Sequence, residues 1–261
     1  MKRALAWLPW CAVLLFVGPL VLAVAGSLLN EAALFGGAPI RLTFSHYRSI
    51  LLERSFYQPL LNSLVVSSLT TLLCVTLASM TAYSLARLRF FGRRLLSGLF
   101  LMVAMFPQIS IVSPLYLLLK WLGLIDTKAG LVLPYLTFAM PLAVWLLVSH
   151  FKQLPRGVEE AALLDGASRW TVLKDIVIPM ALPGIFSTAI VTFIYCWNEF
   201  LFALSFTISS NQRTAPVAIA LFRGQYQIPW GEILAGTVLC ALPVALLFLV
   251  FQKRIVKSLG A

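Results

Sequence analysis

Six apolar runs, each long enough to cross a lipid bilayer as a helix, constrain the fold of this chain more than any other feature. A helix that crosses the hydrocarbon core needs about 20 apolar residues, and its backbone polar groups must be satisfied inside the protein. The sequence therefore predicts an all-α, polytopic membrane protein with six transmembrane helices. The runs cover residues 4–29, 61–86, 95–119, 130–148, 183–208 and 233–251.

Composition agrees with a membrane protein. Of the 261 residues, 61% are hydrophobic and only 11% are charged, whereas about a quarter of residues are charged in an ordinary soluble domain. The net charge of +11 would suggest a nucleic-acid partner in a soluble chain. In a chain this apolar, we expect the basic residues to mark the cytoplasmic ends of the spans instead, with no nucleic-acid partner.

The distribution of basic residues predicts the topology. Six spans return the chain to the side on which it started, so both termini are expected in the cytoplasm. This orientation places 13 of the 20 basic residues inside, as the positive-inside rule requires. The predicted cytoplasmic set is Lys2, Arg3, Arg87, Arg89, Arg93, Arg94, Lys152, Arg156, Arg169, Lys174, Lys253, Arg254 and Lys257.

We expect two parts along the chain. Residues 1–60 hold the first transmembrane helix and an external loop, and residues 61–261 form the transmembrane core. The first apolar run exceeds the ~7–15 residues of a signal peptide, so it is predicted to span the membrane.

A long polar stretch at 154–179 separates the fourth and fifth runs, on the predicted cytoplasmic side. Val158, Ala161 and Ala162 stand at i, i+3 and i+4, which predicts the apolar face of a short amphipathic helix. The acidic residues of this stretch lie elsewhere on that helix.

Three further residues predict how the stretch continues. Gly166 can end the first helix because glycine adopts the left-handed conformation without steric cost. Ser168 can cap a second helix, whose apolar face begins with Trp170 and Leu173. Pro179 is expected to close that second helix.

The spacing in this stretch resembles the EAA loop of the membrane subunits of ABC importers. That pattern reads EAA, three residues, G, nine residues, I, one residue, LP, and the one departure here is Ile178 in place of leucine. The resemblance implies a type I ABC importer permease fold and a coupling helix that docks into a cleft of a cytoplasmic ATPase subunit. It gives the coupling role to Glu160, Ala161, Ala162, Gly166, Ile176 and Pro179.

Polar residues inside the third apolar run suggest a second functional region. Pro107 and Pro114 free backbone groups, which are tolerated at membrane depth only where protein or a water-filled cavity satisfies them. Either the prolines mark a packing kink, or Gln108, Ser110 and Ser113 face a translocation path.

Glu199 lies inside the fifth run, roughly 24 Å along a helix from Pro183 at ~1.5 Å per residue. A carboxylate costs ~2.5–3.5 kcal/mol near the bilayer centre, so it should meet water or a hydrogen-bond donor. We predict that it lines the translocation path. Asn198 and Trp197 are further candidates, although successive side chains point about 100° apart and Trp197 could equally be a packing anchor.

Further sequence runs resemble the maltose-type carbohydrate importers: AYSLAR at 82–87, MFP at 105–107, WNEF at 197–200 and RTAPVAIA at 213–220. The resemblance implies a sugar-importing permease that pairs with a second homologous permease, two cytoplasmic ATPase subunits and an extracytoplasmic sugar-binding protein. Segment 209–231 would be the external loop that reaches into the binding protein. The sequence leaves open which di- or oligosaccharide or related glycoside is carried.

No enzymatic activity is expected of this chain. It lacks a phosphate-binding GxxxxGK[ST] sequence, so ATP and Mg²⁺ are expected on the partner ATPase, with no cofactor, metal or catalytic residue here. Two alternatives stay open: a secondary transporter driven by an ion gradient, and a membrane scaffold that anchors an ATPase. A secondary transporter tends to show intramembrane carboxylates and internal repeats, and this chain has one such carboxylate and no evident repeat.

Overall fold

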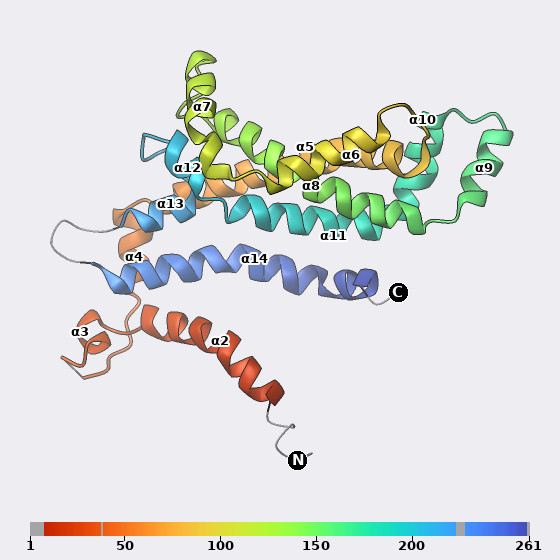
Figure 1. Cartoon of the computed structure of the whole chain (residues 1–261). Coiled ribbons are helices and arrows are strands. Elements are labelled where there is room, and N and C mark those ends of the chain that lie inside the picture. Colours follow the sequence, from red (N-terminus) through yellow and green to blue (C-terminus); the bar gives the residue numbers. More distant parts are fainter. Residues whose placement is uncertain (1–7, 38, 223–227, 260–261) are drawn as a thin grey trace. The chain divides into compact units, whose positions relative to one another are not determined.

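Helices are the regular elements of this protein (Figure 1). The computed structural model describes residues 8–37, 39–222 and 228–259, and within them the one β contact is an isolated bridge between Leu29 and Leu42. The predicted all-α class is therefore confirmed. The elements are α2 (Leu8–Ser27), α3 (Glu31–Leu34), α4 (Ser45–Arg48), η1 (Ser49–Glu53), α5 (Tyr57–Arg87), α6 (Arg93–Met105), α7 (Gln108–Trp121), α8 (Lys128–Gln153), α9 (Arg156–Leu164), α10 (Arg169–Thr171), η2 (Val172–Val177), α11 (Ile178–Trp197), α12 (Leu201–Phe206), α13 (Ala215–Ala220) and α14 (Trp230–Leu259).

Four of the six predicted runs coincide with helices long and apolar enough to cross a membrane, which makes this a multi-pass membrane protein. They are Tyr57–Arg87, Lys128–Gln153, Arg169–Trp197 and Trp230–Phe251. The first run corresponds to α2, in which Val13–Ser27 is a shorter apolar helix. Its side chains are mostly exposed, as suits contact with lipid.

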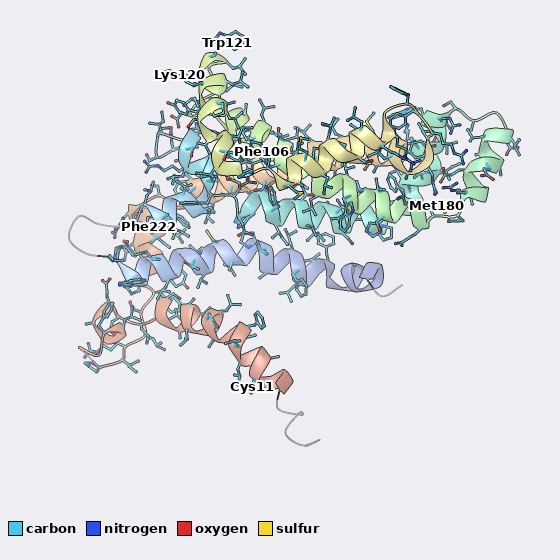
Figure 2. All side chains as sticks on the ribbon, in the orientation of Figure 1. Cys11, Phe106, Lys120, Trp121, Met180 and Phe222 are labelled. Carbon is cyan, nitrogen blue, oxygen red and sulfur yellow. The ribbon has the colours of Figure 1, made fainter. Side chains whose placement is uncertain are left out.

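The third run is bent, as in the packing kink that the sequence offered as one interpretation of its prolines. It consists of α6 and α7, which meet at an angle of 98°. Pro107 explains the corner, because it lacks an N–H and forces Phe106 into an extended conformation, with φ −74° and ψ 130°. Figure 2 shows Phe106 at this corner and Lys120 and Trp121 at the far end of α7. Pro114 lies inside α7.

The fifth run also differs from its prediction. Its helix ends at Trp197 and not at residue 208, and after Asn198, Glu199 and Phe200 the short helix α12 begins at Leu201. Glu199 therefore lies at a break between two helices.

The described chain forms two compact units, Met1–Leu60 with Thr214–Leu246 and Leu61–Arg213 with Leu247–Ala261. The first unit has a small apolar core. Ile50 and Phe56 pack there with Ala215, Phe222 and Ala235, and the rings of Phe56 and Phe222 meet edge to face.

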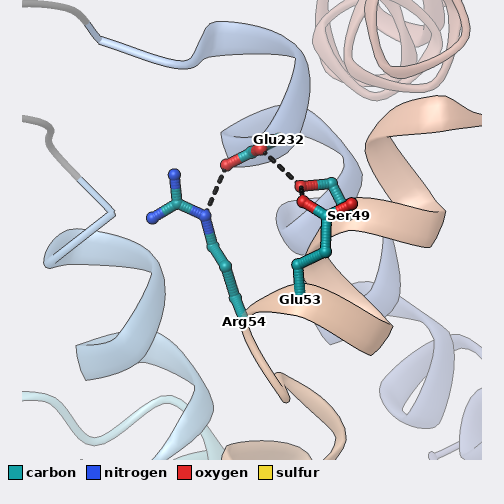
Figure 3. Close-up of polar contacts among 4 residues, drawn as sticks. All are labelled: Ser49, Glu53, Arg54 and Glu232. Carbon is teal, nitrogen blue, oxygen red and sulfur yellow. Dashed lines mark hydrogen bonds and ion pairs between the residues drawn. The ribbon is translucent and has the colours of Figure 1, made fainter.

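A polar cluster in the first unit joins η1 to the first turn of α14 (Figure 3). Arg54 Nε lies 2.7 Å from Glu232 Oε2, and its guanidinium stands 5.1 Å from the centre of the Phe222 ring. Ser49 Oγ lies 2.8 Å from Glu232 Oε1 and 3.0 Å from Glu53 Oε2. Arg54 thus contacts Phe222, which lies before segment 223–227, and Glu232, which lies after it.

The second unit is organised around α8, which packs along α11 and α6. Close approach of α8 and α11 requires Gly184, because a Cβ at this position would lie 2.5–2.9 Å from the His150 ring. Tyr135, Leu147 and Phe151 of α8 are among its fully buried side chains.

Candidate functional site

The polar loop after α8 turns at Gly166 as the sequence predicts. Gly166 has φ +91°, the left-handed conformation that glycine adopts without strain. Its N–H donates to Leu163 O at 3.2 Å, and the N–H of Ala167 donates to Ala162 O at 2.9 Å. These two bonds are the Schellman pattern, which satisfies the last carbonyls of α9.

Ser168 caps the second helix, again as predicted. Its Oγ accepts a hydrogen bond of 3.1 Å from the N–H of Thr171 and also lies 2.8 Å from Thr171 Oγ1. The first N–H groups of a helix have no acceptor within the helix, and the Ser168 side chain supplies one. Gly166 and Ser168 together fix a corner between α9 and α10.

Pro179 does not close the second helix, which corrects the sequence prediction. The chain continues as one helical span from Arg169 to Trp197, and Pro179 stands in the first turn of α11. The π-helical turn η2 immediately precedes it. Because a π-helix bonds i to i+5, its wider turn can accommodate a residue that lacks an N–H and would crowd the i−4 carbonyl. The corner is thus joined to the fifth span by continuous helix, and Ile176 lies inside η2.

The exposed side of the corner carries large apolar side chains. Leu164 is 89% exposed and Trp170 is 60% exposed. Glu160 and Ala161 are exposed on the same helix, and Ala162 is half-buried. Leu173, by contrast, is buried with Val172 and Val177.

The predicted apolar face of α9 is mostly exposed in this chain: Val158 is 45% exposed, and Ala161 is exposed as well. Glu159 is buried instead. The reason is an ion pair that periodicity within one helix cannot reveal.

Arg87, the last residue of α5, pairs with Glu159 through Nη2 and Oε1 at 2.7 Å, and the two side chains are 4% and 10% exposed. Arg87 Nη2 also donates to Leu154 O at 2.9 Å, so one guanidinium joins the ends of α5 and α8 to the first turn of α9. Figure 1 shows α9 and α10 at the end of this unit where α5 gives way to α6. The sequence places Arg87 among the cytoplasmic basic residues at the end of a membrane span, but it does not identify Glu159 as its partner.

The break at 198–200 places Glu199 differently from expectation. The residue is buried, and its Oε1 accepts from the N–H of Phe202 at 2.7 Å while Oε2 accepts from the N–H of Ala203 at 3.1 Å. Both carboxylate oxygens therefore satisfy the first amides of α12. Tyr135 of α8 lies within electrostatic reach of this carboxylate. The role of Glu199 in a translocation path stays a prediction, and its contacts in this chain are those of a helix cap.

The other path candidates divide into packed and exposed residues. Trp197 is buried and stacks on Phe193, with ring centroids 5.6 Å apart. Asn198 is exposed, and its Nδ2 donates to Ile194 O at 2.9 Å. Trp197 thus has the packing role that the sequence left open, and Asn198 is the one of the two on the surface.

The structure brings α7 and α11 together through Gln108. Its Nε2 donates to the hydroxyl of Tyr195, a residue that sequence analysis did not select. Tyr195 precedes Asn198 by three positions and so shares its face of α11. Ser110 and Ser113 are exposed on α7, and both stay predicted path residues.

Polar contacts also fix the segment after α12. Asp126, with φ +61°, accepts hydrogen bonds from the N–H groups of Ile208 and Ser209 at 2.8 and 3.0 Å and from the Ser209 hydroxyl. Asn62 Nδ2 donates to the carbonyls of Asn211 and Arg213 at 2.7 and 3.0 Å. In the predicted external loop 209–231, α13 occupies Ala215–Ala220, and residues 223–227 lie outside the described chain.

Comparisons with known proteins agree with this geometry. Residues 74–260 match the family model described as binding-protein-dependent transport system inner membrane component. The trehalose transport system permease protein SugB of Mycobacterium tuberculosis is 44% identical over 223 residues, covering 85% of this chain and 81% of the relative. The trehalose/maltose transport system permease protein MalG of Thermococcus litoralis is 41% identical over 237 residues, covering 88% and 85%.

A solved structure shares the fold. A chain of a bacterial ABC transporter involved in the import of the acidic polysaccharide alginate superposes with a TM-score of 0.82 at 21% identity, covering 97% of this chain and 95% of that one. The likeness confirms the ABC importer permease fold expected from the sequence.

Proposed function

Because this chain belongs to the family of binding-protein-dependent transport system inner membrane components, we propose that it is the permease subunit of an ABC importer for a sugar. The proposed cargo is a di- or oligosaccharide or a related glycoside. This class is supported by two relatives above 40% identity whose names specify trehalose and trehalose/maltose transport.

The observation that carries the proposal is the corner between α9 and α10. Its bends are fixed by the backbone of Gly166 and by the Ser168 cap, while Leu164 and Trp170 stay exposed. Exposed apolar side chains on a rigid, polar turn are typical of a protein interface. We propose that a cytoplasmic ATPase subunit docks here and that Glu160, Ala161 and Ala162 belong to its contact surface.

The corner can transmit movement in two directions. Through η2 it continues into α11, so displacement of the corner moves the fifth span directly. Through Glu159 and Arg87 it is fixed to the end of α5. ATP and Mg²⁺ would bind to the ATPase subunits, and this chain would supply the mechanical link and the path.

The translocation path is proposed to run beside the α6–α7 corner and the end of α11. The exposed side chains of Asn198, Ser110 and Ser113, with the Gln108–Tyr195 pair, offer the hydrogen-bonding groups that sugar hydroxyls need. Glu199 would stabilise the break between α11 and α12 by capping α12, on the buried side of this region. A second homologous permease would complete the path, and an extracytoplasmic sugar-binding protein would deliver the cargo, with both termini of this chain in the cytoplasm.

Uptake by the reconstituted importer tests the proposal. Proteoliposomes holding this chain, its partner permease and the ATPase, supplied with the binding protein, are expected to accumulate labelled trehalose or maltose only with ATP on the ATPase side. Accumulation that follows an imposed proton or sodium gradient without ATP would identify a secondary transporter. If the complex assembles normally but accumulates no sugar either with or without ATP, the result would favour the membrane scaffold.

A further inference from the structure

The connection between α5 and α6 forms an open hollow of about 500 Å³, which no role described above uses. The apolar helix α5 ends at Arg87, and α6 begins the bent helix pair α6–α7, which is together long and apolar enough to cross a membrane. A short connection between two apolar helices of this kind lies in the headgroup layer of the bilayer. The hollow is lined by Arg89, Phe90, Phe91, Gly92, Arg93 and Arg94.

The charge of this hollow is uncompensated within the described chain. Two ion pairs occur among the described residues, Arg54–Glu232 and Arg87–Glu159, and neither includes Arg89, Arg93 or Arg94. The sequence contains no acidic residue between Glu53 and Asp126. Arg93 and Arg94 also begin α6, which has no acidic residue in its first turn, where the helix dipole adds further positive potential. No acidic side chain of the described residues therefore pairs with these three guanidinium groups.

The same connection exposes aromatic surface. Phe91 is completely exposed and Phe90 is 39% exposed. An aromatic side chain beside several arginines at a membrane surface is the combination that interfacial segments use to insert among acyl chains while contacting anionic headgroups. A soluble partner anion would account for the arginines but not for Phe91.

We propose that residues 89–94 bind the headgroup of an anionic phospholipid. The guanidinium groups of Arg89, Arg93 and Arg94 contact its phosphate, and Phe91 inserts at the boundary between headgroups and acyl chains. The site lies beside Arg87, and therefore beside the ion pair that holds α9. Lipid binding does not depend on which cargo is carried, so a failure of the proposed sugar transport would leave this proposal intact.

Native mass spectrometry of the purified, fully assembled importer tests the headgroup site. Phosphatidylglycerol should bind more tightly than phosphatidylcholine, and Arg93→Gln with Arg94→Gln should weaken phosphatidylglycerol binding about 25-fold, from about 5-fold for each arginine. Arg41→Gln with Arg48→Gln removes two exposed arginines elsewhere and should change nothing. Equal binding of both lipids, or an equal loss in this control pair, would overturn the proposal.

A second measurement leaves all the arginines in place. Phe91→Cys is labelled with bimane in a chain whose four native cysteines are replaced, and the importer is placed in phosphatidylcholine nanodiscs with or without phosphatidylglycerol. Brominated phosphatidylglycerol should quench the label. Protection of the label by the ATPase subunits with no quenching would assign the surface to a protein contact, and displacement of the lipid by inorganic phosphate would assign it to a free anion; either result contradicts the proposal.

Discussion

The α9–α10 corner and the α11–α12 break solve the same local problem in different surroundings. In each, a helix ends, the chain turns, and a side-chain oxygen caps the next helix: Ser168 caps α10 and Glu199 caps α12. The corner is exposed and turns through a left-handed glycine. At the break, Glu199 is buried between the exposed residues Asn198 and Phe200, and none of the three has a positive φ.

The difference concerns what each region leaves free for other molecules. At the corner a neutral hydroxyl suffices for capping, and the acidic and apolar side chains on its surface remain available to a partner. At the break the capping group is the charged carboxylate of Glu199. Both of its oxygens already accept hydrogen bonds from the N–H groups of Phe202 and Ala203, although the sequence had suggested this residue as a ligand for cargo. A buried carboxylate in a membrane protein can therefore be explained by backbone amides one turn away.

The largest effect is expected where the corner is tied to α5. Arg87→Leu should destabilise the chain by ~3–5 kcal/mol, because it leaves the buried carboxylate of Glu159 without its partner. The double variant Arg87→Leu with Glu159→Leu should recover much of this loss, since apolar pairs often replace buried ion pairs at little cost. Arg156→Leu, at the exposed start of α9, is the matched control. Unfolding of the purified importer in detergent measures all three, and equal losses in the single and double variants would mean that the pair is not coupled.

The second-largest effect is expected from substitutions of Glu199. Glu199→Leu deprives two buried amides of their acceptor and should cost ~1–3 kcal/mol, whereas Glu199→Gln keeps one carbonyl oxygen and should cost less. If Glu199 also contributes to the path, Leu should impair uptake more than Gln with assembly intact. The measurements are thermal unfolding and sugar uptake on the same preparations. Wild-type stability of the Leu variant would contradict the capping role. Asn198→Leu, an exposed neighbour, controls for added apolar surface in the unfolding measurement alone, because Asn198 is itself a proposed path residue.

Gly166 comes next. A Cβ at this position would meet no atom within 4 Å, so Gly166→Ala tests backbone conformation alone and should cost ~1–2 kcal/mol for a left-handed residue. Gly166→Pro, which cannot adopt φ +91° and removes the N–H bonded to Leu163, should insert normally but uncouple ATP hydrolysis from uptake. Gly157→Ala is the matched control, because its Cβ also has open space and its φ is not positive. The ratio of sugar imported to ATP hydrolysed is the readout, and a normal ratio in Gly166→Pro would count against coupling through the corner.

The smallest effect is expected at Asp126, on the connection between α7 and α8. Burial acts to raise the pKa of this carboxyl, but hydrogen bonds from Ser209 and Ile208 and the charge of Arg213 outweigh it and hold the pKa below its ordinary value of 3.8. The ionised group therefore stabilises the folded chain at neutral pH, and this contribution is lost as the pH falls through the lowered pKa. Asp126→Asn should reproduce at neutral pH the loosening of 206–209 that wild type shows only in strong acid. Hydrogen exchange of the Ile208 and Ser209 amides measures it, and unchanged protection in the variant would show that the ionised carboxylate is not needed.

Features that depend on residues close together in the sequence could be predicted, whereas contacts between distant segments could not. The corner was predictable because Gly166 and Ser168 act on backbone within a few residues, at fixed offsets. The helices of the apolar runs were predictable for the same reason, through hydrophobic length. Arg87 and Glu159 meet across distant segments, so no local pattern identified the pair.

Other helix boundaries have causes that hydrophobic length does not show. The prolines of the third run allowed for a kink, but the hydrophobic pattern gives no measure of the 98° turn at Pro107. Pro179 looks like a helix terminator, yet the preceding π-turn accommodates it. Hydrophobicity predicts which residues lie in the membrane. It does not predict the break at 198–200, where the carboxylate of Glu199 accepts hydrogen bonds from the first amides of α12.

The most direct test of the account concerns whether the ATPase covers the α9–α10 corner. In a chain without its native cysteines, Leu164→Cys is treated with a membrane-impermeant maleimide in inverted and right-side-out vesicles, with Arg213→Cys as the reference for the opposite face. Leu164→Cys should react in inverted vesicles when the ATPase is stripped away and become protected when it is restored, while Arg213→Cys should react only in right-side-out vesicles. Labelling of Leu164→Cys from outside, or an equal rate with and without the ATPase, would contradict the assignment of this corner as the coupling surface.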